Sequence, residues 1–66
     1  MNIRINGTVE LIDRAGSIAE LIAGKGLHPE RVVVEHNRRM VPRGEWPDVM
    51  LKEDDSIEIV SFVGGG

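Results

Sequence analysis

Apolar and polar residues alternate near the start of the chain. Residues 2–6 follow a period of two, which is typical of a β-strand with one buried face. Asn6 and Gly7 come next, and this pair favours a type I′ turn, because both central positions of that turn need positive φ. Residues 8–12 resume the alternation. The apolar residues that alternate are Ile3 and Ile5 in the first segment and Val9 and Leu11 in the second. The pattern predicts two antiparallel strands joined by a tight turn.

The pattern changes to a helical period after a short loop. Ser17 and Glu20 have the spacing of a capping box, in which each side chain satisfies a backbone N–H of the other residue. Apolar residues then recur at helical spacing and form one stripe: Ile18, Leu21 and Ile22. We expect Gly24 or Gly26 to be the left-handed residue that ends the helix.

The second half of the chain again has strand character. Residues 31–37 and 56–63 are predicted strands, and residues 40–41 form a short strand between them. By alternation, one face of the long strands carries Val32, Val34, Ile57 and Ile59, which we expect to face the core. Residues 43–49 have no clear period, and Trp46 is their one large apolar anchor for the core.

The order of these elements predicts an α+β fold. A hairpin followed by a helix buries both apolar faces only if the helix lies across one face of the sheet. The last strand is then free to pair in parallel with the first. We therefore predict a β-grasp (ubiquitin-like) domain over residues 1–63: a mixed sheet of four to five strands, with one main helix packed on one face. Residues 64–66 are expected to form a flexible C-terminal tail.

Composition narrows the classes of function. A chain of 66 residues makes one domain at most. It has no cysteine, which excludes disulfides and thiolate metal sites and favours a reducing compartment, so we expect a cytoplasmic protein. No apolar run is long enough to span a membrane. The net charge of −3 and the scarcity of aromatic residues argue against a nucleic-acid partner.

The three glycines at positions 64–66 allow two interpretations. They are either a frayed end or a segment that presents the carboxylate of Gly66 for reaction. Glycine has no Cβ, so Gly65 and Gly66 could thread a narrow channel in another protein. A carboxylate is a weak nucleophile and would attack ATP only inside an enzyme that neutralises charge and aligns the reactants.

A docking surface is expected next to this tail. Strand alternation places Val60 and Phe62 on the sheet face that the helix cannot cover, and Val33 joins them from the adjacent strand. An exposed apolar patch on a small domain is a candidate interaction site.

Several segments resemble one family, the ThiS-type sulfur carriers of thiamine biosynthesis. The resemblance covers essentially the whole chain and rests on "IRING", "VVVEHN", "VPRGEW", "LKEDDSIEIVSFV" and the final "GGG". The glycines would fit any ubiquitin-like carrier, whereas Val41-Pro42-Arg43 with Trp46 is more specific. The family's last turn usually reads Asp-Gly-Asp. Here Asp54 takes the glycine position, which implies a small loss of stability.

The resemblance implies that partner enzymes carry out the reactions in which this chain takes part. A ThiF-like adenylating enzyme would activate Gly66 with ATP, a persulfide sulfur donor would convert it to a thiocarboxylate, and a ThiG-like thiazole synthase would receive the sulfur. On this view the chain is not an enzyme, binds no cofactor or metal itself, and is a monomer when free. The reactive residues are Gly65 and Gly66, and the expected partner-binding residues are Val33, Arg43, Val60, Phe62, Val63 and Gly64.

Alternatives with the same tail remain open. They are the small subunit of molybdopterin synthase, another sulfur carrier, a ubiquitin-like modifier that forms isopeptide bonds with lysines, and a β-grasp module with an inert tail. His28 and His36 are expected to be structural or merely exposed, since no third ligand lies near them in the sequence.

Overall fold

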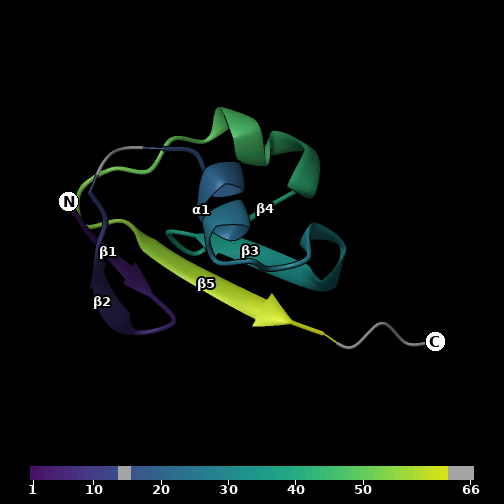
Figure 1. Cartoon of the computed structure of the whole chain (residues 1–66), viewed down its shortest axis with the longest axis horizontal. Coiled ribbons are helices and arrows are strands. Elements are labelled where there is room, and N and C mark those ends of the chain that lie inside the picture. The colour runs from purple at the N-terminus through teal and green to yellow at the C-terminus, as the bar shows by residue number, and fades with distance from the viewer. Residues whose placement is uncertain (14–15, 63–66) are drawn as a thin grey trace.

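The last strand of the chain lies in the middle of the sheet. The computed structural model describes residues 1–13 and 16–62. Its elements are β1 (Asn2–Ile5), β2 (Thr8–Leu11), α1 (Ile18–Gly24), the 3₁₀ helix η1 (Pro29–Arg31), β3 (Val32–His36), β4 (Arg39–Val41), the 3₁₀ helix η2 (Arg43–Asp48) and β5 (Ser56–Ser61). The strands are ordered β2-β1-β5-β3-β4, and α1 and η2 lie on one side of them (Figure 1).

The pairing of β1 with β5 confirms the predicted parallel contact. Backbone N–H groups of Arg4 and Asn6 donate to the carbonyl oxygens of Asp55 and Ile57, both at 2.9 Å. All other strand pairs in the sheet are antiparallel. The five-stranded mixed sheet with one α-helix on one face is the predicted β-grasp architecture.

The first hairpin has the predicted turn. Asn6 and Gly7 have φ of 50° and 85°, as a type I′ turn requires. The register places Val9 opposite Arg4, and so on the face away from the core residue Ile3. Alternation in this strand was predicted, but its apolar side chains turn outward, with Val9 54% and Leu11 75% exposed.

Helix α1 is closed at both ends as the sequence indicated. The Ser17 backbone N–H donates to Glu20 Oε1 at 2.8 Å, and the Glu20 backbone N–H donates to Ser17 Oγ at 3.1 Å. At the other end Gly26 has φ of 70°, and the Leu27 N–H reaches the Ile22 carbonyl at 3.2 Å. This Schellman arrangement turns Leu27 back toward the core.

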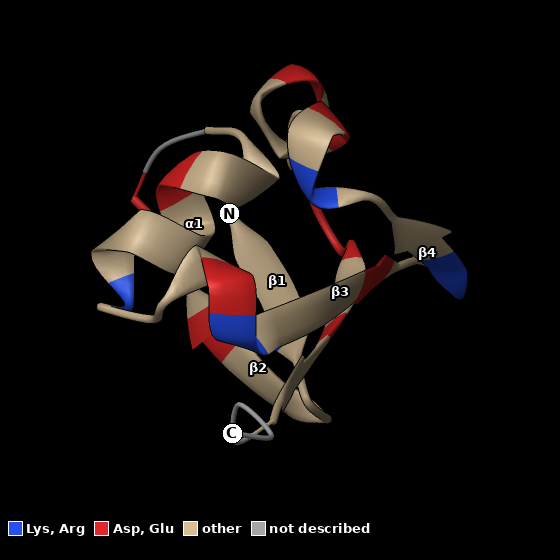
Figure 2. Ribbon diagram, turned by 90° about the vertical axis from the view of Figure 1, so that its right-hand side faces the viewer, with Lys and Arg blue, Asp and Glu red and all other residues tan. Residues whose placement is uncertain are grey.

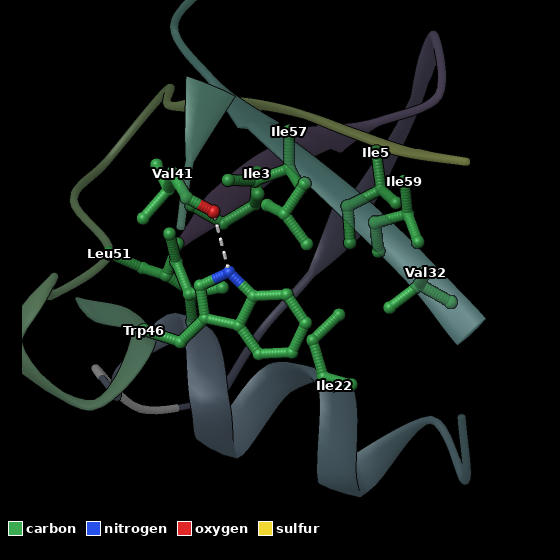
Figure 3. Close-up of a cluster of buried hydrophobic side chains, with 11 residues drawn as sticks. Ile3, Ile5, Ile22, Val32, Val41, Trp46, Leu51, Ile57 and Ile59 are labelled. Carbon is green, nitrogen blue, oxygen red and sulfur yellow. Dashed lines mark hydrogen bonds between the residues drawn. The ribbon is translucent and has the colours of Figure 1, made fainter. Parts of the chain in front are cut away.

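Trp46 is the predicted anchor of the core. Its ring packs among aliphatic side chains between the helical layer and the sheet (Figure 3), and its Nε1–H donates to the Val41 carbonyl at 2.9 Å. Burying an indole requires such a partner for its N–H. The buried hydrophobic residues are Ile3, Ile5, Ile18, Ile22, Val32, Val34, Val41, Trp46, Leu51, Ile57 and Ile59. Within residues 1–13 and 16–62, no helix is long and apolar enough to cross a membrane.

Candidate functional site

The candidate docking surface lies on the open face, meaning the sheet face opposite α1. Val33 and Val60 are directly opposite each other across β3 and β5. Phe62 follows Val60 by two residues, and its N–H donates to the Arg31 carbonyl at 2.8 Å, so the pairing with the start of β3 continues past the end of β5. The exposed fractions are 39% for Val33, 57% for Val60 and 47% for Phe62. The structure therefore brings together three of the predicted partner-binding residues.

An acidic pair borders this apolar patch. Glu35 and Glu58 are cross-strand partners one step along the same face, and exposed Met40 lies opposite Glu35 on β4. Like charges placed directly opposite each other weaken a sheet by up to about 1 kcal/mol. Sequence reasoning missed this pair, because only the strand register places the two carboxylates side by side. A patch with an apolar centre and an acidic border is complementary to a partner surface whose apolar centre is bordered by basic side chains.

Arg43 lies beside the apolar patch rather than in it. It is the first residue of η2, is exposed, and lines a shallow hollow with Val33 and Met40 at the β4 edge of the sheet. In the described part of the chain, no carboxylate lies within salt-bridge distance of its guanidinium. The structure therefore brings Arg43 near Val33 but does not place it with Val60 and Phe62.

The remaining predicted site residues are Val63, Gly64, Gly65 and Gly66. They lie outside the described residues, as does the predicted boundary between a domain at 1–63 and a tail at 64–66. Their roles stay predictions.

A polar cluster occupies the end of the sheet where the β3–β4 turn meets the start of β5. Asp55 is buried, and its carboxylate contacts His36 Nε2 at 2.8 Å, the Asn37 side-chain amide at 3.0 Å and the Lys52 backbone N–H at 2.8 Å. Burial alone would raise the pKa of Asp55, but the hydrogen bonds from His36, Asn37 and Lys52, with the charge of His36, hold its pKa below the ordinary value. His36 thus has a structural contact, in line with its prediction.

The cluster has no sign of a metal centre. Among residues 1–13 and 16–62, no three His, Asp or Glu side chains gather closely enough to hold an ion. The polar cluster instead fixes two turns to each other.

Strand β5 lies in the centre of the sheet, parallel to β1, and helix α1 covers the face opposite the open face. This arrangement defines a β-grasp protein. The family model described as "ThiS family" matches residues 3–66. The chain belongs to the ThiS family.

Curated relatives differ in length. The chain is 41% identical over 51 residues to "Sulfur carrier protein ThiS" of Bacillus subtilis, which covers 77% of both proteins. It is 42% identical over 66 residues to "Thiazole synthase" of Magnetococcus marinus, and 32% identical to the protein of the same name from Paramagnetospirillum magneticum. The chain spans about a fifth (20%) of the length of these two synthases.

A solved structure shares the whole fold. The crystal structure of thiamine biosynthesis protein ThiS from Geobacter metallireducens superposes with a TM-score of 0.86 at 29% identity, and the match covers all of both chains. The solution structure of a thiamine biosynthesis protein from that organism matches with a TM-score of 0.83.

Proposed function

We propose that this protein is a cytoplasmic sulfur carrier of thiamine biosynthesis that takes up sulfur as a thiocarboxylate on Gly66. The observation that carries the proposal is the family match over residues 3–66, which includes the three glycines. The Bacillus subtilis relative is named a sulfur carrier protein, and the Geobacter metallireducens relative is named a thiamine biosynthesis protein. The exposed apolar patch supports the proposal, because a carrier must be held by each of its partners in turn.

The loading chemistry takes place in partner enzymes. A carboxylate oxygen of Gly66 attacks the α-phosphorus of ATP, and pyrophosphate leaves. The terminal sulfur of a persulfide then attacks the acyl carbon, and AMP leaves with the electron pair of the broken C–O bond. A thiol cleaves the remaining S–S bond, which leaves the thiocarboxylate and a new disulfide. ATP and the sulfur donor are supplied by partners, so the chain contributes a carboxyl group and a docking surface rather than catalysis.

Thiazole synthase is the proposed acceptor of the sulfur. Two proteins with that name contain a segment that matches all of this chain. This favours the thiamine route over molybdopterin synthesis and over protein modification. A ThiF-like adenylating enzyme is the proposed partner for activation.

The open face is the proposed contact with these partners. Val33, Val60 and Phe62 would supply the apolar centre, and Glu35 and Glu58 would meet basic side chains at its border. Arg43 is proposed to contact an acidic group at the periphery, and Val63 and Gly64 to lead into the active site of the partner.

Intact-mass spectrometry tests the proposal. The protein is incubated with ATP, a ThiF-like adenylating enzyme and a persulfide donor, and the expected product has one oxygen atom replaced by sulfur. High-molecular-weight conjugates would instead indicate a modifier. An unchanged mass, under conditions in which the same enzymes load a known carrier, would contradict the proposal.

A truncation gives the matching genetic test. Removal of Gly65 and Gly66 should abolish growth without thiamine in a strain that depends on this protein, while the melting temperature stays the same. Gly44→Ala is the control, because an added Cβ at this exposed site meets no atom within 4 Å. Growth of the truncated strain without thiamine would rule out the carrier role.

A further inference from the structure

The turn between β3 and β4 holds an arginine in a conformation that favours glycine. Asn37 and Arg38 have φ of 49° and 71°, so the turn is of type I′. The first hairpin forms the same turn with Asn6 and Gly7, at φ of 50° and 85°. A side chain at the second of these positions costs free energy that glycine avoids. The second hairpin therefore keeps an arginine where a glycine would be more stable.

The charge of Arg38 is not paired within the described part of the chain. Its neighbour Asn37 fixes the turn, because the Asn37 side chain donates to Asp55 Oδ1 at 3.0 Å and accepts from the Ser56 N–H at 2.9 Å. Arg38 is exposed, and no carboxylate of residues 1–13 and 16–62 lies within salt-bridge distance of its guanidinium. Backbone strain at a residue whose side chain does not support the fold points to a function of that side chain.

Two further arginines lie at the same edge of the sheet. Residues 36–44 contain Arg38, Arg39 and Arg43 but no Asp or Glu, in a chain whose net charge is −3. Figure 2 shows basic positions on both sides of β4, with no acidic position between them along the ribbon. Arg39 and Arg43 are exposed, and neither has a described carboxylate within salt-bridge distance. We call these three arginines the basic edge.

Protection of the edge strand explains only part of this pattern. Positive charge and proline are usual devices that keep an edge strand from pairing, and they account for Arg39 and Pro42. Arg38 lies in the turn before β4, and Arg43 lies in η2. Neither residue is in the strand that would pair, so their charges require another explanation.

An apolar hollow lies beside Arg43. Val33, Met40 and Pro42 line it with Arg43, and its volume is about 280 Å³. Glu30 also lines the hollow but forms no salt bridge with Arg43. Small-molecule sites have volumes of roughly 300–1,000 Å³, so this hollow is better suited to one apolar side chain of a protein. A nucleic acid is disfavoured, because the chain as a whole is an anion and the basic edge has no aromatic residue for stacking.

We propose that the basic edge docks against an acidic surface of a partner protein, one of whose apolar side chains enters the hollow beside Arg43. Three unpaired guanidinium groups on an otherwise acidic chain are complementary to carboxylates. The inference rests on the proposed carrier function, because the adenylating enzyme and thiazole synthase are the proposed partners. The Glu35–Glu58 pair lies on the neighbouring strands, so charges of both signs fix the orientation in which the carrier docks.

Calorimetric titration with the adenylating enzyme and with thiazole synthase tests the proposal. The double variant Arg38→Gln, Arg39→Gln should bind at least one of them about fivefold more weakly than the wild type, and the difference should shrink at high salt. The double variant Lys25→Gln, Lys52→Gln has the same net charge and should bind as the wild type does.

The outcomes separate this inference from the proposed function. If the wild type binds but the two double variants have equal affinity for each enzyme, the basic edge is not a docking site and the carrier function stands. If the wild type binds neither enzyme, the carrier function fails and the inference fails with it. Binding of a single-stranded oligonucleotide that only the arginine variant loses, with enzyme affinity unchanged, would overturn the inference in favour of a nucleic acid.

A glycine exchange separates the conformational cost of Arg38 from its role in docking. Arg38→Gly should raise the melting temperature by a few degrees, because it relieves the left-handed strain, yet weaken binding about twofold or more. Gly7→Arg makes the reverse exchange in the matching turn, where an added Cβ meets no atom within 4 Å. It should lower the melting temperature and leave the affinity unchanged. An Arg38→Gly variant that melts no later than the wild type, or binds as tightly, would overturn the proposal.

Discussion

The side chain of Asn6 forms two hydrogen bonds with the main chain of Ile59. Its Nδ2 donates to the Ile59 carbonyl at 3.1 Å, and its Oδ1 accepts from the Ile59 N–H at 2.7 Å. Strand β1 ends at Ile5, so the amide of Asn6 takes the place of a peptide group and adds one more step to the β1–β5 ladder. The same residue begins the type I′ turn with φ of 50°. One asparagine thus ties the first hairpin to the last strand.

Replacing Asn6 should separate these two roles. Asn6→Gly keeps the positive φ but leaves two Ile59 groups without partners, and we expect a loss of about 1–3 kcal/mol in the free energy of unfolding. Asn6→Ala should lose more, because alanine resists positive φ. Urea unfolding measures both variants. Asn2→Ala, at an exposed position of β1, is the control, and an Asn6→Gly variant as stable as the wild type would refute the bridging role.

Asp54 offers a stabilising substitution. It has φ of 69°, is exposed, and uses its backbone N–H to donate to the Asn2 carbonyl at 2.8 Å. Asp54→Gly relieves the left-handed strain and keeps that hydrogen bond, so we expect a gain of about 0.5–1 kcal/mol, seen as a higher melting temperature. Asp54→Val should instead lower the melting temperature. A glycine variant that melts earlier than the wild type would contradict this account.

Asp55 should make the free energy of unfolding depend on pH in the acidic range. Its folded-state pKa is below the ordinary value, so its contribution is complete above the unfolded-state pKa of about 3.9 and is lost as the pH falls through the folded-state pKa. Asp55→Ala should therefore be less stable than wild type by about 2 kcal/mol at pH 7, and the difference should shrink below about pH 4. Urea unfolding across this range measures it. An unchanged difference at all pH values would show that the hydrogen bonds of the carboxylate are not responsible.

Trp46→Phe should weaken the core. The substitution removes the Nε1–H that satisfies the buried Val41 carbonyl and leaves a void beside Ile22, so we expect a loss of about 2–4 kcal/mol. Thermal unfolding followed by circular dichroism measures the change. Since Trp46 is the one tryptophan, its fluorescence reports wild-type unfolding directly. Retention of full stability by the phenylalanine variant would mean that the hydrogen bond contributes little.

Phe62→Asp tests the proposed docking surface. Because Phe62 is about half exposed on the open face, a carboxylate there should weaken binding to the adenylating enzyme about tenfold or more without loss of cooperative melting. Calorimetric titration measures the affinity. Met50→Asp, an exposed methionine that lies outside the sheet, is the matched control. Equal affinity of both variants would exclude Phe62 from the contact.

Local sequence patterns predicted the helix, the strands and the turns. The strand register and the direction of some side chains depend on contacts between distant parts of the chain. The capping box at Ser17, the turn at Asn6-Gly7 and the inward side chains of β3 and β5 follow from short-range chemistry. The outward direction of Val9 could not be predicted from alternation alone, because the turn sets the register and the helix selects the covered face. For the same reason the Glu35–Glu58 pair and the contact between Asn6 and Ile59 were visible only in the folded sheet.

The central position of β5 has a consequence for how the protein is made. The two neighbours of β5 in the sheet are β1 and β3, and both are synthesised before it. Until residues 56–61 leave the ribosome, the edge of each strand that later pairs with β5 has no partner strand. A seven-residue helix is too short to persist without packing. Nascent or prematurely terminated chains should therefore stay unfolded and open to proteases, so quality control would remove them before they could compete with intact molecules.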